Sequence, residues 1–179
     1  MDVNPAPEAY GSVTISLTVS PCHEAIEFYK SAFGAEEAMP PMIGPDGKIS
    51  HAEIRIGDTI VMLSDEQSAS PTKSPRSAGT TTAVLFLYTD DVDSLWERAI
   101  ALGAREIYPL SLQFYGDKGG RVEDPFGHQW GLGQHVEDVS PEEMERRVAE
   151  FYQASRLSRR RLLSDELGHR DDPGDIRRT

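Results

Sequence analysis

Apolar and polar residues alternate along several short segments of this chain, the pattern of strands that place one face on a core. Between residues 13 and 19, every second residue is Val, Ile or Leu, and the residues between them are Thr or Ser. Residues 49–56 alternate again, with Ala52, Ile54 and Ile56 on one face. Similar patterns predict further strands at residues 36–43, 59–64, 83–89, 105–114, 120–123 and 129–133.

Two helices are predicted between these strands. Ile26, Tyr29 and Phe33 recur at helical spacing, and Gly34 follows them in the usual position for ending a helix. A second apolar stripe lies within residues 91–102 and is also followed by a glycine.

The chain contains an internal repeat. Residues 27–37 line up with residues 96–106, and each half reads strand, helix and then three strands. The pattern therefore predicts two βαβββ modules, at residues 10–65 and 83–136.

The remaining segments differ from the modules in composition. Residues 66–82 are rich in Ser, Thr and Pro without periodicity, which predicts a mobile linker. Ser140-Pro141-Glu142-Glu143 is a capping box, so a helix is predicted over residues 140–163. The polar residues 164–179 are predicted to form a disordered tail.

The net charge limits the classes of partner. The chain carries −12 at pH 7, and residues 140–179 are neutral because nine arginines there balance nine Asp and Glu residues. The charge therefore belongs to the main domain, which argues against nucleic acid and anionic lipid as its partners. We interpret the basic cluster at residues 156–161 as a solvated helix end, since neighbouring carboxylates cancel its charge.

Hydropathy and cysteine content indicate a cytoplasmic protein. No apolar run approaches membrane-spanning length, so we expect no membrane partner. Residues 1–11 lack the features of a signal peptide. The single cysteine, Cys22, excludes an internal disulfide and fits a reducing compartment.

A motif near the end of the second module resembles a known family. Residues 116–130 read G-D-x-x-G-x-V-x-D-P-F-G-H-x-W, in which residues 124–127 form a tight turn between two strands. This run resembles the last hairpin of the vicinal oxygen chelate superfamily, the glyoxalase, bleomycin-resistance and dioxygenase group, and most closely its PhnB-like subgroup. Further matching pieces lie at residues 25–29, 33–35, 51–57 and 90–93.

The resemblance implies an α+β fold over residues 10–139. Its two βαβββ modules would form a curved mixed sheet around a cleft, with helices outside, and the C-terminal helix would be an addition. It also implies a homodimer, because modules of this superfamily often pair between chains.

Metalloenzymes of this superfamily bind a divalent ion at four strand positions. Those positions correspond here to Thr14, Met62, Val84 and Gly131, which do not form a ligand set for a hard cation. We therefore predict no metal and no other cofactor, and we do not expect metal-dependent glyoxalase or dioxygenase activity. A displaced cluster of His51, Glu53 and His135 is the alternative metal site.

Strand parity predicts the residues that face the cleft. Together with two aromatic residues expected at its rim, Phe114 and Tyr115, the proposed ligand-binding set is Thr14, Ser16, His51, Glu53, Met62, Val84, Phe86, Phe114, Tyr115 and Gly131. This mixture of apolar and polar groups fits a small organic ligand, aromatic or cationic. A dimer interface or a second small core would have a similar composition.

Two functions follow from this face. The first is small-molecule binding without the usual metal site, acting in sequestration of, or resistance to, an antibiotic or toxic metabolite. The second is a metal-independent enzyme of isomerase or lyase type, with His51 and Glu53 as catalytic acid and base. Direct hydrogen bonding between them is not expected, since residues i and i+2 on a strand rarely bond.

Overall fold

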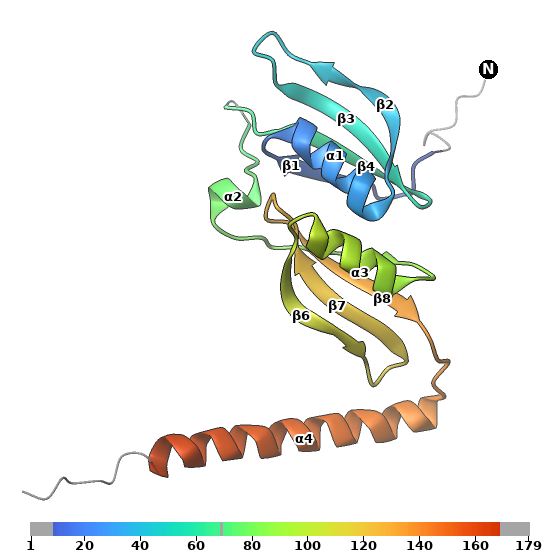
Figure 1. Cartoon of the computed structure of the whole chain (residues 1–179), viewed down its shortest axis with the longest axis vertical. Helices are drawn as coiled ribbons and strands as arrows, with labels where there is room; N and C mark the ends of the chain where they lie inside the picture. The colour runs from blue at the N-terminus through green and yellow to red at the C-terminus, as the bar shows by residue number, and fades with distance from the viewer. Residues whose placement is uncertain (1–8, 69, 169–179) are drawn as a thin grey trace, which may run out of the picture. The chain divides into compact units, whose positions relative to one another are not determined.

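The chain folds into eight strands and four helices within residues 9–68 and 70–168, which the computed structural model describes (Figure 1). This is the predicted α+β class, with two βαβββ modules and a C-terminal helix. The chain divides into two compact units. One consists of Met1–Ser111 and Lys118–His135, and the other of Leu112–Asp117 and Val136–Thr179.

The first module is a four-stranded sheet with the order β1-β4-β3-β2. Strand β1 runs parallel to β4, and the other neighbours are antiparallel. The parallel pair requires a crossover, which α1 supplies across one face of the sheet (Figure 1). The bounds are β1 Ile15–Val19, α1 Cys22–Phe33, β2 Glu36–Ile43, β3 Ile49–Ile56 and β4 Thr59–Asp65.

The second module repeats this topology in a separate sheet with the order β5-β8-β7-β6. The strand pairing is therefore distributed over two four-stranded sheets, and β1 and β5 each lie at the edge of their own sheet. Helix α3 lies over this sheet as α1 does over the first (Figure 1). The bounds are β5 Val84–Tyr88, α3 Val92–Ala101, β6 Arg105–Leu112, β7 Asp117–Glu123 and β8 Gln129–His135.

Helix α1 is buried on most of its circumference, because it packs against its own sheet and against the second module. The rings of Tyr29 and Phe33 lie 5.5 Å and 4.8 Å from that of Trp130 on β8. Phe28 meets Phe126 of the β7–β8 turn with ring centroids 6.2 Å apart. One apolar core therefore extends through both modules.

Asp124, at the start of the β7–β8 turn, joins the modules by hydrogen bonds. The side chain is 3% exposed and accepts from Tyr29 Oη at 2.7 Å and Trp130 Nε1 at 3.0 Å. Its other oxygen accepts from the backbone N–H groups of Phe126 and His128, each at 2.9 Å. A buried carboxylate is stable only with such partners, so the turn and the α1 contact depend on each other.

The two modules fix the start of their helices by equivalent contacts. Asp65, at the end of β4, accepts from the backbone N–H groups of Cys22 and Ile49 at 2.8 Å and 2.7 Å. Gln134, near the end of β8, accepts from Val92 N at 3.3 Å. Both side chains satisfy helix N–H groups that have no partner within the helix.

The predicted linker contains ordered structure. Within residues 66–82 the structure has a short helix, α2 (Pro75–Ala78), whose Ser74 cap accepts from Ser77 N at 3.3 Å. Ser74 is fully buried and donates to Glu66 through both N and Oγ, at 3.0 Å and 2.9 Å. Composition alone indicated a loop here because capping by single Ser and Glu side chains produces no periodicity.

The C-terminal helix α4 (Pro141–Gly168) extends beyond the expected end at residue 163. No Pro or Gly interrupts it before Gly168, and strong helix formers such as Leu and Arg continue past residue 160. Of the predicted disordered tail, residues 169–179 lie outside the described residues. No helix in the described part of the chain is long and apolar enough to cross a membrane.

The unit that contains α4 has its own contacts. Arg147 donates to both Glu137 oxygens at 2.8 Å and 2.7 Å, and to the Phe114 carbonyl at 3.3 Å. The rings of Phe114 and Phe151 lie 4.8 Å apart. The segment 112–117 thus packs on the first turns of α4.

Replacing Asp124 tests the junction between the modules. We expect Asp124→Ala to lower the free energy of unfolding by about 3–5 kcal/mol, because four buried donors lose their acceptor. Urea denaturation would measure this, with Glu36→Ala as control, since the exposed Glu36–Arg55 pair contributes at most about 1 kcal/mol. A loss below about 1 kcal/mol for Asp124→Ala would show that the junction does not depend on this carboxylate.

Candidate functional site

The strand register confirms which predicted residues share the outer face of each sheet, opposite the helix. In the first module, Met62 is paired with Ser16 on one side and with Glu53 on the other. In the second, Phe86 is paired with Gly131. Parity along a strand fixes these faces, so the predicted residues lie on the faces that the sequence assigned to them.

Glycines in β8 allow two aromatic rings to lie across the strand. A Cβ atom at Gly131 would come within 2.5 Å of the Phe86 ring, and one at Gly133 within 3.3 Å of the Tyr88 ring. These side chains remain 63% and 58% exposed. Glycine in β8 therefore lets the rings of Phe86 and Tyr88 from β5 lie directly against the β8 backbone, where they form a flat apolar surface.

His51 and Glu53 bond directly on β3, contrary to the expectation for residues two apart on a strand. His51 Nε2 lies 2.9 Å from Glu53 Oε1, and Tyr10 Oη donates to the same oxygen at 2.6 Å. Tyr10, which precedes the first strand, is missing from the predicted site. Alternation of apolar and polar residues predicts contacts only for residues within a strand. Tyr10 lies outside the strands, so only the fold reveals its contact with Glu53.

The surroundings of Glu53 favour its charged form. Although Glu53 is only 9% exposed, hydrogen bonds from Tyr10 and then from His51 lower its pKa below the ordinary 4.5. The hydrogen bond to Glu53 raises the pKa of Tyr10. In the tautomer in which His51 Nε2 carries the hydrogen, this nitrogen donates a hydrogen bond to Glu53 and Nδ1 has a free lone pair.

An apolar pocket of about 300 Å³ lies where the two modules meet. Its walls come from the edge strands β1 and β5, the β3–β4 turn and β8. Four of the lining residues have polar side-chain atoms, namely Asp58, Thr59, Tyr88 and Trp130, and the others are apolar or glycine: Ile15, Ile56, Gly57, Val61, Leu85, Phe86 and Leu87. Apolar walls with few polar groups are typical of sites for small organic molecules.

Of the predicted ligand-binding residues, Phe86 lines this pocket. In the first module, Ile15 and Val61 line it in place of their neighbours Thr14 and Met62, which have the opposite parity. The reason is that the sheets are separate, so residues of β1 and of its neighbour β4 that face the other module border the space between them. His51 and Glu53 do not line this pocket, and Ser16, Val84 and Gly131 stay on the outer faces.

Phe114 and Tyr115 belong to the unit that contains α4. The ring of Phe114 meets those of Tyr115 and Phe151 at 5.3 Å and 4.8 Å. Their participation in ligand binding stays a prediction.

The positions that bind metal in related enzymes have no suitable donors here. The four positions predicted to correspond to metal ligands, Thr14, Met62, Val84 and Gly131, provide one hydroxyl and one thioether, a poor donor set for a hard divalent cation. The fold also does not assemble the alternative cluster of His51, Glu53 and His135, since no group of three or more His, Cys, Asp or Glu residues within the described part of the chain could bind a metal.

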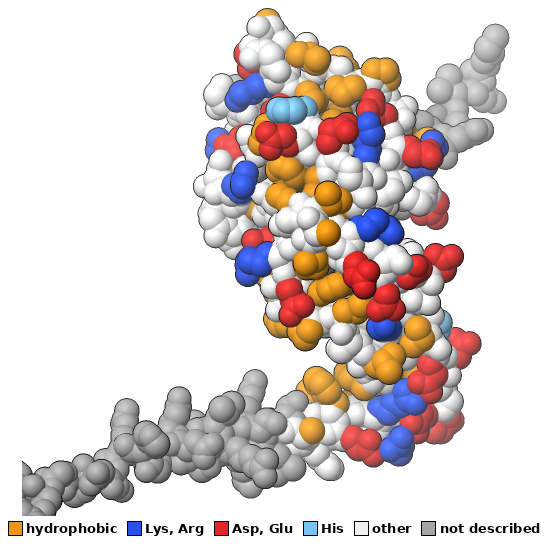
Figure 2. Space-filling view, viewed as in Figure 1, with side chains coloured by type: hydrophobic (Ala, Val, Ile, Leu, Met, Phe, Trp, Pro, Cys, Tyr) orange, Lys and Arg blue, Asp and Glu red, His pale blue; other side chains and the backbone are white. Residues whose placement is uncertain are grey.

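Cys22 offers no nucleophile. Burial raises the pKa of its thiol to about 12, with a further contribution from the Asp65 carboxylate. Charged groups elsewhere are mixed, and Figure 2 shows acidic and basic side chains interspersed on the face it presents. On that face the charge of −12 is therefore not gathered into one acidic patch.

Comparisons with known proteins agree with this architecture. The family model described as Glyoxalase/Bleomycin resistance protein/Dioxygenase superfamily matches residues 11–132. The chain is 40% identical over 132 residues to the uncharacterized protein Mb0911c of Mycobacterium bovis, covering 72% of this chain and 86% of that protein. The chain therefore belongs to the Glyoxalase/Bleomycin resistance protein/Dioxygenase superfamily.

Solved structures give the same result for the fold. TioX from Micromonospora sp. ML1 is similar with a TM-score of 0.55 and 27% identity, over 70% of this chain and 100% of TioX. The PhnB protein from Bacillus cereus is similar with a TM-score of 0.55 and 20% identity, over 69% of this chain and 99% of that protein. The PhnB likeness, at this identity, concerns the fold alone.

The contact between Tyr10 and Glu53 predicts a pH dependence. Because folding lowers the pKa of Glu53, its contribution to stability is present above about pH 4.5 and is lost as pH falls through the lowered pKa. We expect Tyr10→Phe to raise the pKa of Glu53, so that the stability difference from the unmodified protein disappears at acid pH. Carboxyl ¹³C NMR titration would measure the pKa, with Tyr108→Phe as control, and an unchanged Glu53 titration would contradict the assignment.

Proposed function

We propose that this protein binds a small aromatic or apolar molecule without a metal and acts by sequestering it, as expected for resistance to an antibiotic or toxic metabolite. The observation that carries the proposal is the apolar pocket beside the exposed rings of Phe86 and Tyr88. Its volume of about 300 Å³ lies at the small end of the range for such sites. A cytoplasmic location fits the single buried thiol of Cys22.

The charge on the pocket supports a cation as one class of ligand. Asp58 lies in the lining, and its Oδ1 accepts a hydrogen bond only from the Thr59 hydroxyl, at 3.1 Å, within the described residues. The aromatic faces of Phe86 and Tyr88 attract cations as well as flat apolar groups. A planar ligand with a positive group would use both features.

We also propose a homodimer in which a second copy covers the outer faces of the sheets. Apolar side chains are unusually exposed there: Met42 beside His51 is 56% exposed, and Phe86, Tyr88 and Tyr108 on the second sheet exceed this. Large exposed apolar side chains on a soluble protein favour association. An outer face from each copy would then form an enclosed cleft containing both the His51–Glu53 pair and the aromatic rings.

The alternative function is metal-independent proton transfer by His51 and Glu53. The direct contact of 2.9 Å favours it, because a buried carboxylate fixes the imidazole tautomer and leaves one ring nitrogen as a base. Tyr10, bonded to the same carboxylate, would help to position the pair.

Two substitutions distinguish the functions, once a thermal-shift screen has identified a ligand. If the protein only binds, Phe86→Ala should weaken binding by about one to two orders of magnitude, because an aromatic contact surface is lost. His51→Ala should then have little effect, and Tyr152→Ala on α4 is the control for an exposed ring outside the pocket and the outer faces. If the protein is an enzyme, His51→Ala should lower turnover by about 100-fold or more while binding survives. Titration calorimetry and turnover assays measure both, and unchanged binding for Phe86→Ala would show that the pocket is misassigned.

Light scattering tests the dimer. At micromolar concentration we expect twice the chain mass of 19.8 kDa. Met42→Glu should raise the dimer dissociation constant at least about tenfold, because it places a charge in an apolar contact. Ile100→Glu on α3, outside the outer faces, is the matched control. A monomer under these conditions, or equal effects of the two substitutions, would reject this arrangement.

A further inference from the structure

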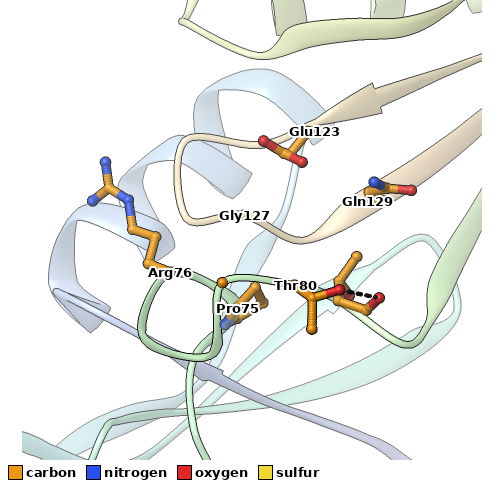
Figure 3. A pocket seen from close by; sticks show the side chains of 8 residues that line it. Pro75, Arg76, Thr80, Glu123, Gly127 and Gln129 are labelled. Carbon is orange, nitrogen blue, oxygen red and sulfur yellow. Dashed lines mark hydrogen bonds between the residues drawn. The ribbon is translucent and has the colours of Figure 1, made fainter.

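A second, polar pocket of about 340 Å³ shares no lining residue with the apolar one. The segment that joins the modules forms one wall, and the ends of β7 and β8 with their turn form the other (Figure 3). In Figure 3 Arg76 and Gln129 lie on opposite sides of this pocket, with the Arg76 side chain extending away from Gln129 and Glu123 near the upper edge.

The wall around α2 is held in place before any ligand arrives. Ser74 is fully buried and bonded to Glu66, and hydrogen bonds from Ser77 and Ser74 lower the pKa of Glu66 to about 2, so it remains ionised. Pro75 is buried against the turn, where a Cβ atom at Gly127 would lie 3.0 Å from Pro75 Cβ. Gly127 also has φ of +91°, which favours glycine. The backbone of this wall is therefore held in place, while the Arg76 side chain that extends from it is exposed.

Two side chains of the lining have donors without a protein partner. Among the described residues, none forms a hydrogen bond or ion pair with the Arg76 guanidinium or the Gln129 amide. By contrast, Glu123 is paired with Arg105 at 3.0 Å. The hydroxyls of Thr80 and Thr81 donate to backbone carbonyls and so offer acceptor oxygens to a ligand.

The local charge is opposite to that of the whole chain. Glu123 is compensated by Arg105, which leaves Arg76 as an uncompensated positive charge in a protein of net charge −12. A guanidinium binds a carboxylate through two parallel hydrogen bonds. One guanidinium balances a single negative charge. Because the net negative charge of the protein also disfavours a dianion, a monocarboxylate fits this pocket better than a phosphate.

We propose that this pocket binds a small organic monocarboxylate, with its carboxylate paired to Arg76 and a polar substituent hydrogen-bonded to the Gln129 amide. The site is independent of the apolar pocket and of the function proposed for it. The protein would then bind two classes of ligand. Aromatic or cationic molecules would bind the apolar pocket beside Phe86 and Asp58, and organic acids would bind the polar pocket beside Arg76.

The probe for this site is 4-hydroxybenzoate, with the neutral 4-hydroxybenzyl alcohol for comparison. In ¹H–¹⁵N spectra of the full chain we expect saturable shifts of the Gln129 side-chain amide and of Arg76 Nε–H with the acid only. Arg76→Met should raise the dissociation constant at least about tenfold, because the paired charge is lost. Arg55→Met, at an exposed arginine on the other module, should leave binding unchanged.

The outcomes separate the two pockets. Phe86→Ala should not alter the shifts at Gln129 if the acid binds beside Arg76. Four results would each overturn the proposal. They are shifts that do not saturate, equal binding of the alcohol, equal losses of affinity for Arg76→Met and Arg55→Met, and a loss of affinity confined to Phe86→Ala. The effect of Phe86→Ala on the ligand of the apolar pocket is measured separately, so failure of one assignment leaves the other intact.

Discussion

The junction between the two modules is built around one buried carboxylate, that of Asp124. Asp124 accepts hydrogen bonds from two backbone groups of its own turn and from Tyr29 and Trp130, so it fixes a β-turn and joins two modules at once. A lone carboxylate at 3% exposure would be strongly unfavourable. Three of its four donors come from the second module, and the fourth, Tyr29 Oη, comes from α1, so this one bond ties α1 to the β7–β8 turn.

This arrangement determines where ligands can bind. With α1 at the centre of the shared core, the rings of Phe86 and Tyr88 stay exposed on the second sheet, and the edge strands β1 and β5 border an apolar space. The segment between the modules packs on the β7–β8 turn and encloses a polar space. The two pockets differ in chemistry because neither lies within a single module. One lies between the modules, and the other lies between the linking segment and the β7–β8 turn.

Much of the fold could be predicted from the sequence. Alternation of apolar and polar residues predicted the strands, the glycines after the helical stripes predicted the helix ends, and the repeat predicted the two modules. These signals are local and follow from strand and helix geometry. The face assigned to Phe86 and Met62 was correct for the same reason, since parity is fixed once a strand is fixed.

Contacts between distant segments could not be predicted in this way. The bond of Tyr10 to Glu53 and the cap formed by Glu66 and Ser74 are single side-chain contacts that leave no periodic signal. The sequence by itself determined the eight strands, the helices α1, α3 and α4, and the superfamily, but not the short helix α2. Only the tertiary structure decided that Ile15 and Val61, rather than Thr14 and Met62, line the apolar pocket, because the residues that border the space between the modules depend on how the modules pack and not on strand parity.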